Sequence, residues 1–260
     1  MAVQSAQLGD LAISYTETGN GPPLILLHGG LATAAMSWGT AIPILAPHFR
    51  VIMPDSRGHG ETNNPSDHIG YDQMADDIVA FAKAVGAEKP LIVGYSDGGQ
   101  TGIEMALRHP GFARAYVFGG TISERTRDYL DSLHGAGFLA PGQVDVDRLG
   151  QVWGGFLAQI QQVHKGNGEP EYWRKMLAQI STLWIDIPSY SLEQLGTIAE
   201  PSLVIMGDRD HMAGENQPMR LYRALPKGEL AIIPNAGHGA AEGELFWLVV
   251  LDFLRRHSGG

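Results

Sequence analysis

The chain has 260 residues, of which 44% are hydrophobic and 18% charged, a composition that suits one large globular domain and is unlike that of a disordered chain. The formal net charge is −10 and no basic block occurs, which argues against a nucleic-acid partner or an anionic membrane surface. The absence of cysteine excludes disulfides, thiolate metal sites and a cysteine nucleophile.

No targeting or membrane-spanning pattern is evident. Residues 1–10 mix polar and apolar side chains without a basic stretch followed by an apolar run. The apolar run at 245–254 is interrupted by Asp252 and is too short to span a bilayer. We therefore expect an unprocessed, cytoplasmic protein that acts on a small molecule, without nucleic-acid or membrane partners, and the oligomeric state stays open.

In the first half of the chain, short apolar runs alternate with helical periodicity. The Gly9-Asp10 pair, followed by an apolar run, favours a tight hairpin. Repeated strand–helix units indicate an α/β fold with a mostly parallel, doubly wound sheet. The predicted strands are 11–15, 24–27, 49–53, 91–93 and 115–118, and the predicted helices 74–85 and 101–107.

The pattern changes after Thr121. Up to about Ala199, helical stripes over 149–163 and 173–184 replace strand-like runs. Ser191 with Gln194 forms a capping box, typical of a helix start.

Strand signals return later, at 203–206 and 230–233, before an amphipathic helix over 242–256. The sequence thus predicts a core domain made of residues 1–121 and 200–260, interrupted by a helical cap of residues 122–199.

The strongest chemical signal is Gly94-Tyr-Ser-Asp-Gly98, placed directly between a predicted strand and a predicted helix. A nucleophilic serine at such a turn needs strained backbone angles, and glycines on both sides remove side chains that would clash. The following helix directs its N-terminal N–H groups toward the site. We therefore predict Ser96 as the nucleophile.

A serine hydroxyl needs a base to remove its proton. His238 follows the last predicted strand and precedes the last helix, which brings it to the ligand edge of the sheet. The histidines at 48, 109, 164 and 257 lie near helix ends and are given no functional role. His238 is therefore the candidate base.

The base needs a carboxylate to orient it. Met206-Gly-Asp-Arg-Asp-His211 follows the penultimate strand and offers two, Asp208 and Asp210. Both also suit a turn, where aspartate is common. The order Ser…Asp…His holds for either carboxylate.

An acyl-transfer reaction also needs N–H donors for its oxyanion. His28-Gly29-Gly30-Leu31 follows a predicted strand, and the backbone N–H of Gly30 could act together with that of Asp97. Leu31, next to this turn, is a candidate for substrate contact.

Taken together, these motifs resemble the α/β-hydrolase superfamily. The resemblance implies an acid three residues after the glycine that closes its strand, hence Asp210, and a helical cap over the pocket. It implies a serine hydrolase without metal or organic cofactor, and the serine at 96 disfavours members with an aspartate nucleophile. The matching segments are His28-Gly29-Gly30, Asp55-Ser-Arg-Gly-His-Gly60, Gly94-Tyr-Ser-Asp-Gly98, Gly207-Asp-Arg-Asp210 and Asn235-Ala-Gly-His238.

Asp97 departs from the apolar residue common at its position in this family. The Ser-Asp-Gly-Gly run is similar to that of valacyclovirase-like hydrolases, in which the aspartate recognises a substrate amine. The alternative is that Asp97 only stabilises the helix start, pointing to solvent or to helix N–H groups.

The cap contributes three tryptophans, Trp153, Trp173 and Trp184, as candidates for contact with the substrate or the cap–core junction. Alternatively, they form the core of the cap itself. The predicted function is hydrolysis of a small carboxylic ester or lactone through an acyl-serine. C–C bond, amide or aminoacyl-ester hydrolysis and perhydrolysis remain alternatives, as does a ligand-binding receptor on the same fold.

Overall fold

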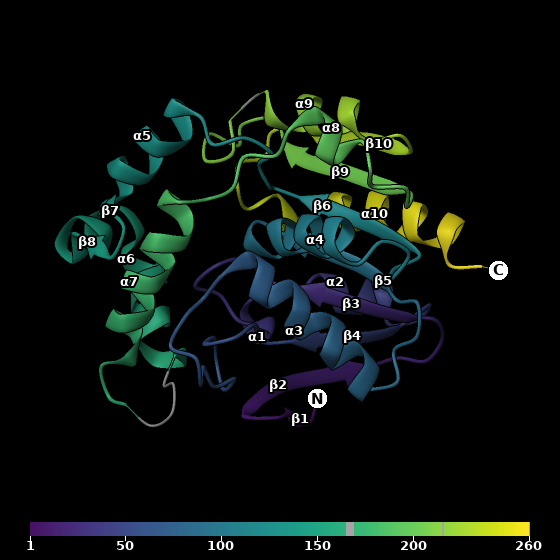
Figure 1. Cartoon of the computed structure of the whole chain (residues 1–260), viewed down its shortest axis with the longest axis horizontal. Helices are drawn as coiled ribbons and strands as arrows, with labels where there is room; N and C mark the ends of the chain where they lie inside the picture. Colours follow the sequence, from purple (N-terminus) through teal and green to yellow (C-terminus); the bar gives the residue numbers. More distant parts are fainter. Residues whose placement is uncertain (165–168, 215, 260) are drawn as a thin grey trace.

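The apolar runs pair into one central sheet. The computed structural model describes residues 1–164, 169–214 and 216–259, and in these residues eight strands pair in the order β1-β2-β4-β3-β5-β6-β9-β10 (Figure 1). The β1–β2 and β2–β4 pairs are antiparallel, and the remaining pairs of this sheet are parallel. The strands are β1 (Gln4–Leu8), β2 (Leu11–Thr18), β3 (Pro23–Leu27), β4 (Arg50–Pro54), β5 (Leu91–Tyr95), β6 (Ala115–Gly119), β9 (Ser202–Gly207) and β10 (Gly228–Ile233).

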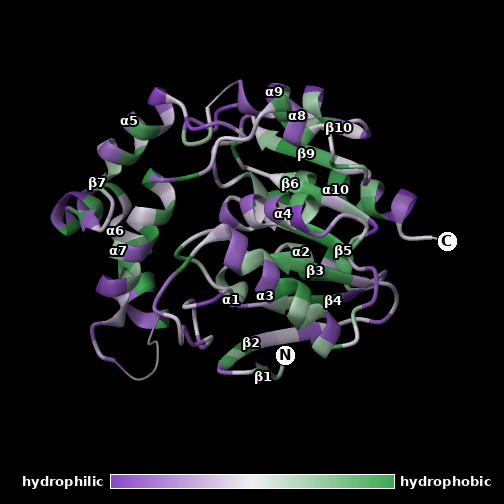
Figure 2. Ribbon diagram, viewed as in Figure 1, coloured by the Kyte–Doolittle hydropathy of each residue, from purple (hydrophilic) through white to green (hydrophobic). Residues whose placement is uncertain are grey.

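Helices cover both faces of this sheet, which explains why its central strands are apolar along their whole length (Figure 2). One hydrophobic cluster joins the sheet to α3, α4 and α9, and a second joins its other face to α1, α2 and α10. The predicted α/β class and parallel sheet are confirmed. The helices are α1 (Ala34–Ser37), α2 (Ala41–Leu45), α3 (Tyr71–Ala84), α4 (Asp97–Arg108), α9 (Gln217–Ala224) and α10 (Glu244–His257).

The N-terminal hairpin extends further than predicted. Gly9-Asp10 connects β1 to β2, with Leu8 opposite Leu11 in the ladder. Most of β1 is exposed, so its sequence carries no continuous apolar run, and the strand was missed for that reason.

The segment between β6 and β9 lies beside the C-terminal ends of the strands (Figure 1). It contains α5 (Arg127–Ala136), α6 (Val146–Val163) and α7 (Tyr172–Ile185), close to the predicted helical stripes. A short hairpin, β7 (Phe138–Ala140) with β8 (Gln143–Val144), corrects the expectation of helices alone. Strands this short show no recognisable alternation.

The last helix of the predicted cap packs against a helix that covers the sheet. The short helix α8 (Leu192–Leu195) begins at Ser191, whose side chain and that of Gln194 form the expected capping box. It packs against α9, which covers the sheet. We therefore propose that the cap ends before Ser191 rather than at residue 199.

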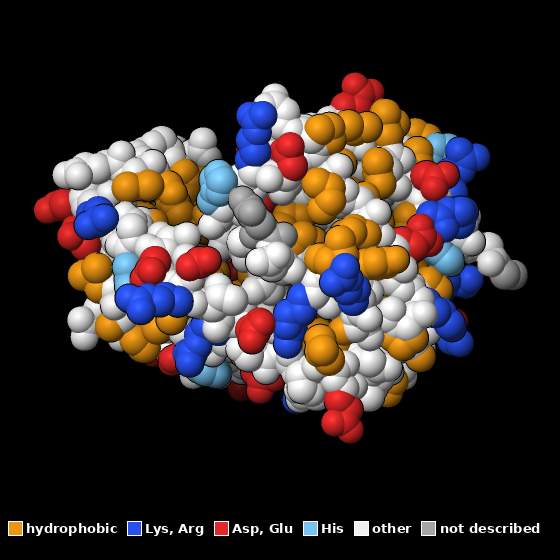
Figure 3. Space-filling model, turned by 90° about the horizontal axis from the view of Figure 1, so that it is seen from above, with side chains coloured by type: hydrophobic (Ala, Val, Ile, Leu, Met, Phe, Trp, Pro, Cys, Tyr) orange, Lys and Arg blue, Asp and Glu red, His pale blue; other side chains and the backbone are white. Residues whose placement is uncertain are grey.

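Charged side chains are dispersed over the surface seen in Figure 3, where lysine and arginine lie among acidic and hydrophobic groups without a single basic patch. Within the described residues, no helix has both the length and the apolar character needed to cross a bilayer.

Candidate active site

Ser96 lies on a sharp turn between β5 and α4. Its φ of 55° and ψ of −117° place it in a region that residues with a Cβ rarely adopt. A Cβ on Gly94 would collide with the backbone of Gly98, and a Cβ on Gly98 would collide with the backbone of Leu27. The N–H of Ser96 donates to the carbonyl of Gly119 (2.8 Å), which helps to hold the strained turn.

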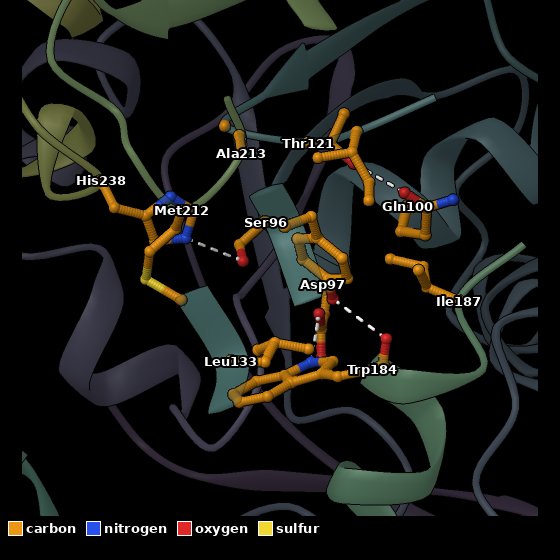
Figure 4. A pocket seen from close by; sticks show the side chains of 13 residues that line it. Ser96, Asp97, Gln100, Thr121, Leu133, Trp184, Ile187, Met212, Ala213 and His238 are labelled. Carbon is orange, nitrogen blue, oxygen red and sulfur yellow. Dashed lines mark hydrogen bonds between the residues drawn. The ribbon is translucent and has the colours of Figure 1, made fainter. Parts of the chain in front are cut away.

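The three predicted catalytic side chains form one hydrogen-bonded chain. The Ser96 Oγ lies 3.0 Å from His238 Nε2 (Figure 4), and His238 Nδ1 lies 2.9 Å and 3.1 Å from the two carboxylate oxygens of Asp210. Because an ionised carboxylate only accepts, Nδ1 carries the proton and Nε2 presents a lone pair to the serine hydroxyl. The arrangement can therefore accept the hydroxyl proton.

Asp210 is held in place by the backbone. Its side chain is fully buried, and its Oδ1 accepts from the N–H groups of Met212 (3.2 Å) and Ala213 (3.1 Å). Asp208, the other candidate, points elsewhere: its Oδ1 accepts from the N–H of Ala236 at 3.0 Å. Backbone hydrogen bonds from the Asn235–Ala236 turn lower the pKa of Asp208. Asp208 thus fixes the loop before His238 without touching the imidazole.

Tyr95 holds the backbone of the residue that carries the base, a role that the sequence analysis did not assign to it. Its hydroxyl donates to the backbone carbonyl of His238 (2.7 Å), and the two rings lie 5.6 Å apart. Burial raises the pKa of Tyr95, so the phenol stays a donor. The one feature of the sequence that points to this role is the position of Tyr95 directly before the nucleophile.

The proposed oxyanion donors come from two loops that approach closely. A Cβ on Gly29 would lie 3.3 Å from Ser96 Cβ, and a Cβ on Gly30 would meet the Asp97 carboxylate and the Trp184 ring. Within the described residues, the N–H groups of Gly30 and Asp97 donate to no protein acceptor. Both are therefore available to a substrate oxygen.

The Asp97 side chain is buried beneath the cap and faces neither solvent nor its own helix. Its carboxylate accepts from Trp184 Nε1 (2.8 and 2.9 Å; Figure 4) and from the Tyr71 hydroxyl (2.9 Å). Burial raises the pKa of Asp97 to about 6, against the opposing effect of these hydrogen bonds. The expectation that Asp97 merely stabilises the helix start misses this contact, which joins the nucleophile's neighbour to α7.

Two cavities meet at Ser96 and His238. One has a volume of about 40 Å³ and lies between the start of α4, the end of β6 and the cap. The other has a volume of about 470 Å³ and lies between the loop that follows β3 (residues 28–32, here the proposed oxyanion loop), the His238 loop and α6. Trp184 and Met212 border both cavities, and Trp153 borders the larger one, so these two candidate tryptophans lie at the cavities.

Two predicted contact residues lie elsewhere. Trp173 is buried in the hydrophobic cluster that joins cap and core, where the Arg174 guanidinium lies 4.2 Å from its ring centre, and it lines neither cavity. Leu31 is fully buried and lines neither cavity. Its φ of 60° turns the side chain into the cluster that joins cap and core. A positive φ at a non-glycine residue cannot be seen in the sequence, so the direction of the Leu31 side chain was not predictable from it.

A histidine of the cap supports the oxyanion loop. His164 Nε2–H donates to the carbonyl of Leu31 (2.8 Å), and its Nδ1 accepts from the N–H of Gly60 (3.0 Å). The N–H of Leu31 donates in turn to His59 Nε2 (3.3 Å). Burial lowers the pKa of His164 to about 4, so the ring is neutral and can both donate and accept.

The described residues contain no group of three His, Asp or Glu side chains placed to bind a metal ion. The groups that the structure brings together at the site are the serine, the imidazole, the carboxylate and the two backbone donors.

Comparisons with known proteins identify the family of the fold. Residues 22–244 match a family model described as alpha/beta hydrolase fold. A 2-hydroxy-6-oxo-6-(2'-aminophenyl)hexa-2,4-dienoic acid hydrolase of Metapseudomonas resinovorans is 29% identical over 96% of this chain and 90% of that protein. A putative carbamate hydrolase, RutD, of a Caulobacter species is 29% identical over 95% and 98%. The solved structure of a serine hydrolase involved in carbazole degradation (CarC) is 26% identical, with a TM-score of 0.79 over 98% of this chain and 99% of that one.

Proposed function

The chain belongs to the α/β-hydrolase fold family and is a hydrolase, and from this premise we propose that it cleaves a small carboxylic ester or lactone through an acyl-serine intermediate. The observation that carries the proposal is the continuous hydrogen-bonded chain from Asp210 through His238 to Ser96, at the junction of two cavities.

The proposed reaction has two steps. In the first, His238 takes the proton of Ser96 while Oγ bonds to the carbonyl carbon, and the imidazolium then gives that proton to the departing alcohol oxygen. In the second, His238 deprotonates a water that attacks the acyl carbon, and Ser96 leaves with the proton. Asp210 holds the imidazole orientation, and the N–H groups of Gly30 and Asp97 stabilise the oxyanion.

Turnover of p-nitrophenyl acetate by wild type and by Ser96→Ala tests this proposal. We expect the variant to fold normally and to lose about three or more orders of magnitude in kcat, because the covalent step is removed. Ser5→Ala, at an exposed position of β1, is the matched control and should keep full activity. An undiminished rate in Ser96→Ala would reject the acyl-serine mechanism, and the absence of turnover in wild type with any ester would favour a binding protein.

C–C bond hydrolysis is the second candidate, favoured by the similarity to the dienoic acid hydrolase. The same base and nucleophile could serve it, so the bond type is decided by what the cavities admit.

Aminoacyl-ester hydrolysis, the third candidate, depends on Asp97. Its carboxylate already accepts from two donors, the Trp184 N–H shared between both of its oxygens and the Tyr71 hydroxyl, so the structure does not require a substrate cation there. We expect Asp97→Asn to change kcat/KM for an aminoacyl ester and for its uncharged analogue by the same factor; a selective loss on the aminoacyl ester would restore the amine hypothesis.

A further inference from the structure

The two cavities differ more than tenfold in volume, about 40 Å³ against about 470 Å³. Since both open at Ser96 and His238, the bond that is broken must lie between them. A substrate therefore places a small portion in one and a bulky portion in the other. The small cavity is therefore suited to a short chain and the large one to the bulkier portion.

The position of the base indicates which portion goes where. The large cavity is bordered by four residues of the loop that carries the base: His238, Gly239, Ala241 and Glu242. The small cavity is bordered from this loop by His238 alone, and it extends along the start of α4. The departing oxygen must lie within hydrogen-bond reach of the protonated His238. This arrangement favours the large cavity for the alcohol and the small one for the acyl group.

The polar groups around the small cavity are already paired. The Thr121 hydroxyl donates to Gln100 Oε1 (2.9 Å; Figure 4), and Gln100 Nε2 donates to the Tyr190 hydroxyl (2.9 Å). The remaining wall includes Leu133 and Ile187, which are buried and apolar. Such a lining suits a short alkyl chain better than a polar or charged group.

Neither cavity offers a cationic partner for an anion. Among the described residues that border them, none is a lysine or arginine, and Asp97 and Glu242 add negative charge. A substrate carboxylate here would be desolvated without compensation.

We propose that the natural substrate class is uncharged esters that join a short alkyl acyl group to a bulky, mostly apolar alcohol. This specificity rests on the proposed ester hydrolysis, and it disfavours the anionic dienoates as substrates of this site.

Three matched comparisons with the wild-type enzyme test the proposal. Across naphthyl acetate, butyrate, hexanoate and octanoate, kcat/KM should fall about tenfold or more between butyrate and hexanoate. Phenylethyl acetate should exceed its isomer methyl phenylpropanoate, which reverses the ester, by about tenfold or more. Methyl 4-acetoxybenzoate should exceed the 4-acetoxybenzoate anion by a similar factor.

Variants then assign the acyl chain to the small cavity. Leu133→Ala and the milder Ile187→Val should raise the ratio of hexanoate to acetate hydrolysis, because both enlarge that cavity. Phe156→Ala, in the wall of the large cavity, should change the ranking of alcohols and leave the acyl-length ratio as in wild type.

A wild-type preference for long acyl chains, for methyl phenylpropanoate or for the anion would overturn the proposal, even if esters are cleaved. An acyl-length ratio that responds to Phe156→Ala and not to the small-cavity variants would overturn the assignment of the cavities. If no ester is cleaved at all, the proposed function fails instead.

Discussion

Asp208 and Asp210 lie two residues apart and have different partners. Asp210 is fully buried and in contact with His238 Nδ1, whereas Asp208 is bound to the backbone of Ala236. The family resemblance implied Asp210, and the hydrogen bonds support that assignment.

Replacement of each aspartate by asparagine separates these roles. We expect Asp210→Asn to lower kcat by about three to four orders of magnitude, because an amide no longer enforces the Nδ1–H tautomer. Asp208→Asn keeps an acceptor oxygen for Ala236, so it should stay within about fivefold of wild type. Steady-state kinetics on one ester decides, and a larger loss at Asp208 would reverse the assignment.

Asp97 should affect stability in a pH-dependent way. Burial raises its pKa to about 6 from 3.8, so its contribution is fully present below pH 3.8 and is lost as the pH rises through 6. Relative to Asp97→Asn, wild type should lose roughly 3 kcal/mol of unfolding free energy across this range. Urea unfolding at several pH values measures the difference, with Asp10→Asn at the exposed hairpin as control; a constant difference between wild type and Asp97→Asn would contradict the buried, ionisable carboxyl.

At the scale of elements, the polar contacts that join cap and core beside the catalytic site include Trp184 to Asp97 and His164 to Leu31. The second holds the residue after Gly30, whose N–H is a proposed oxyanion donor. The position of the cap and the shape of the oxyanion loop are therefore coupled.

His164→Ala should weaken the contact between cap and core. The variant leaves the Leu31 carbonyl and the Gly60 N–H unpaired, so we expect a loss of about 2–4 kcal/mol in unfolding free energy at neutral pH. His48→Ala, at an exposed histidine, is the control.

The pH dependence of His164 is opposite to that of Asp97. Because its pKa falls to about 4 from 6.5, its stabilisation is fully present above pH 6.5 and is lost as the pH falls toward 4. Relative to His164→Ala, wild type should lose roughly 3 kcal/mol of unfolding free energy as the pH falls over this range. An equal difference at pH 7 and pH 4.5 would show that the ring titrates normally.

The cap tryptophans provide a matched pair. Trp153 borders the large cavity, whereas Trp173 is buried away from both. Trp153→Ala should change the ranking among alcohols with little change in Tm. Trp173→Ala should lower the free energy of unfolding by about 3–5 kcal/mol without altering that ranking. Thermal unfolding with a small ester panel measures both; the reverse pattern would place Trp173 at the substrate.

The sequence predicts these elements unevenly, for physical reasons. Continuous apolar runs mark the strands buried on both faces, and helical stripes mark α6 and α7. A stripe does not tell which tryptophan faces the cavity, so Trp173 and Trp184 are indistinguishable by pattern. His164 has no sequence signal, because its partners are backbone groups more than a hundred residues away.

At the scale of the whole molecule, the order of motifs predicts the family and the candidate triad, since each motif closes a strand at the same edge of one sheet. The cavities are not predictable in this way, because they are lined by core and cap residues that lie far apart in the sequence and come together only in the folded chain. The net charge of −10 disfavours the approach of an anionic substrate, and the described residues that border the cavities include no lysine or arginine to bind one.

The most direct test of the account is the covalent capture of the nucleophile. The protein is treated with a fluorophosphonate, digested, and mapped by mass spectrometry. We predict one adduct on the peptide that carries Ser96, none in Ser96→Ala, and full labelling in Ser5→Ala. An adduct on a different serine, or an active enzyme that the reagent neither labels nor inhibits, would contradict catalysis through an acyl-serine at Ser96.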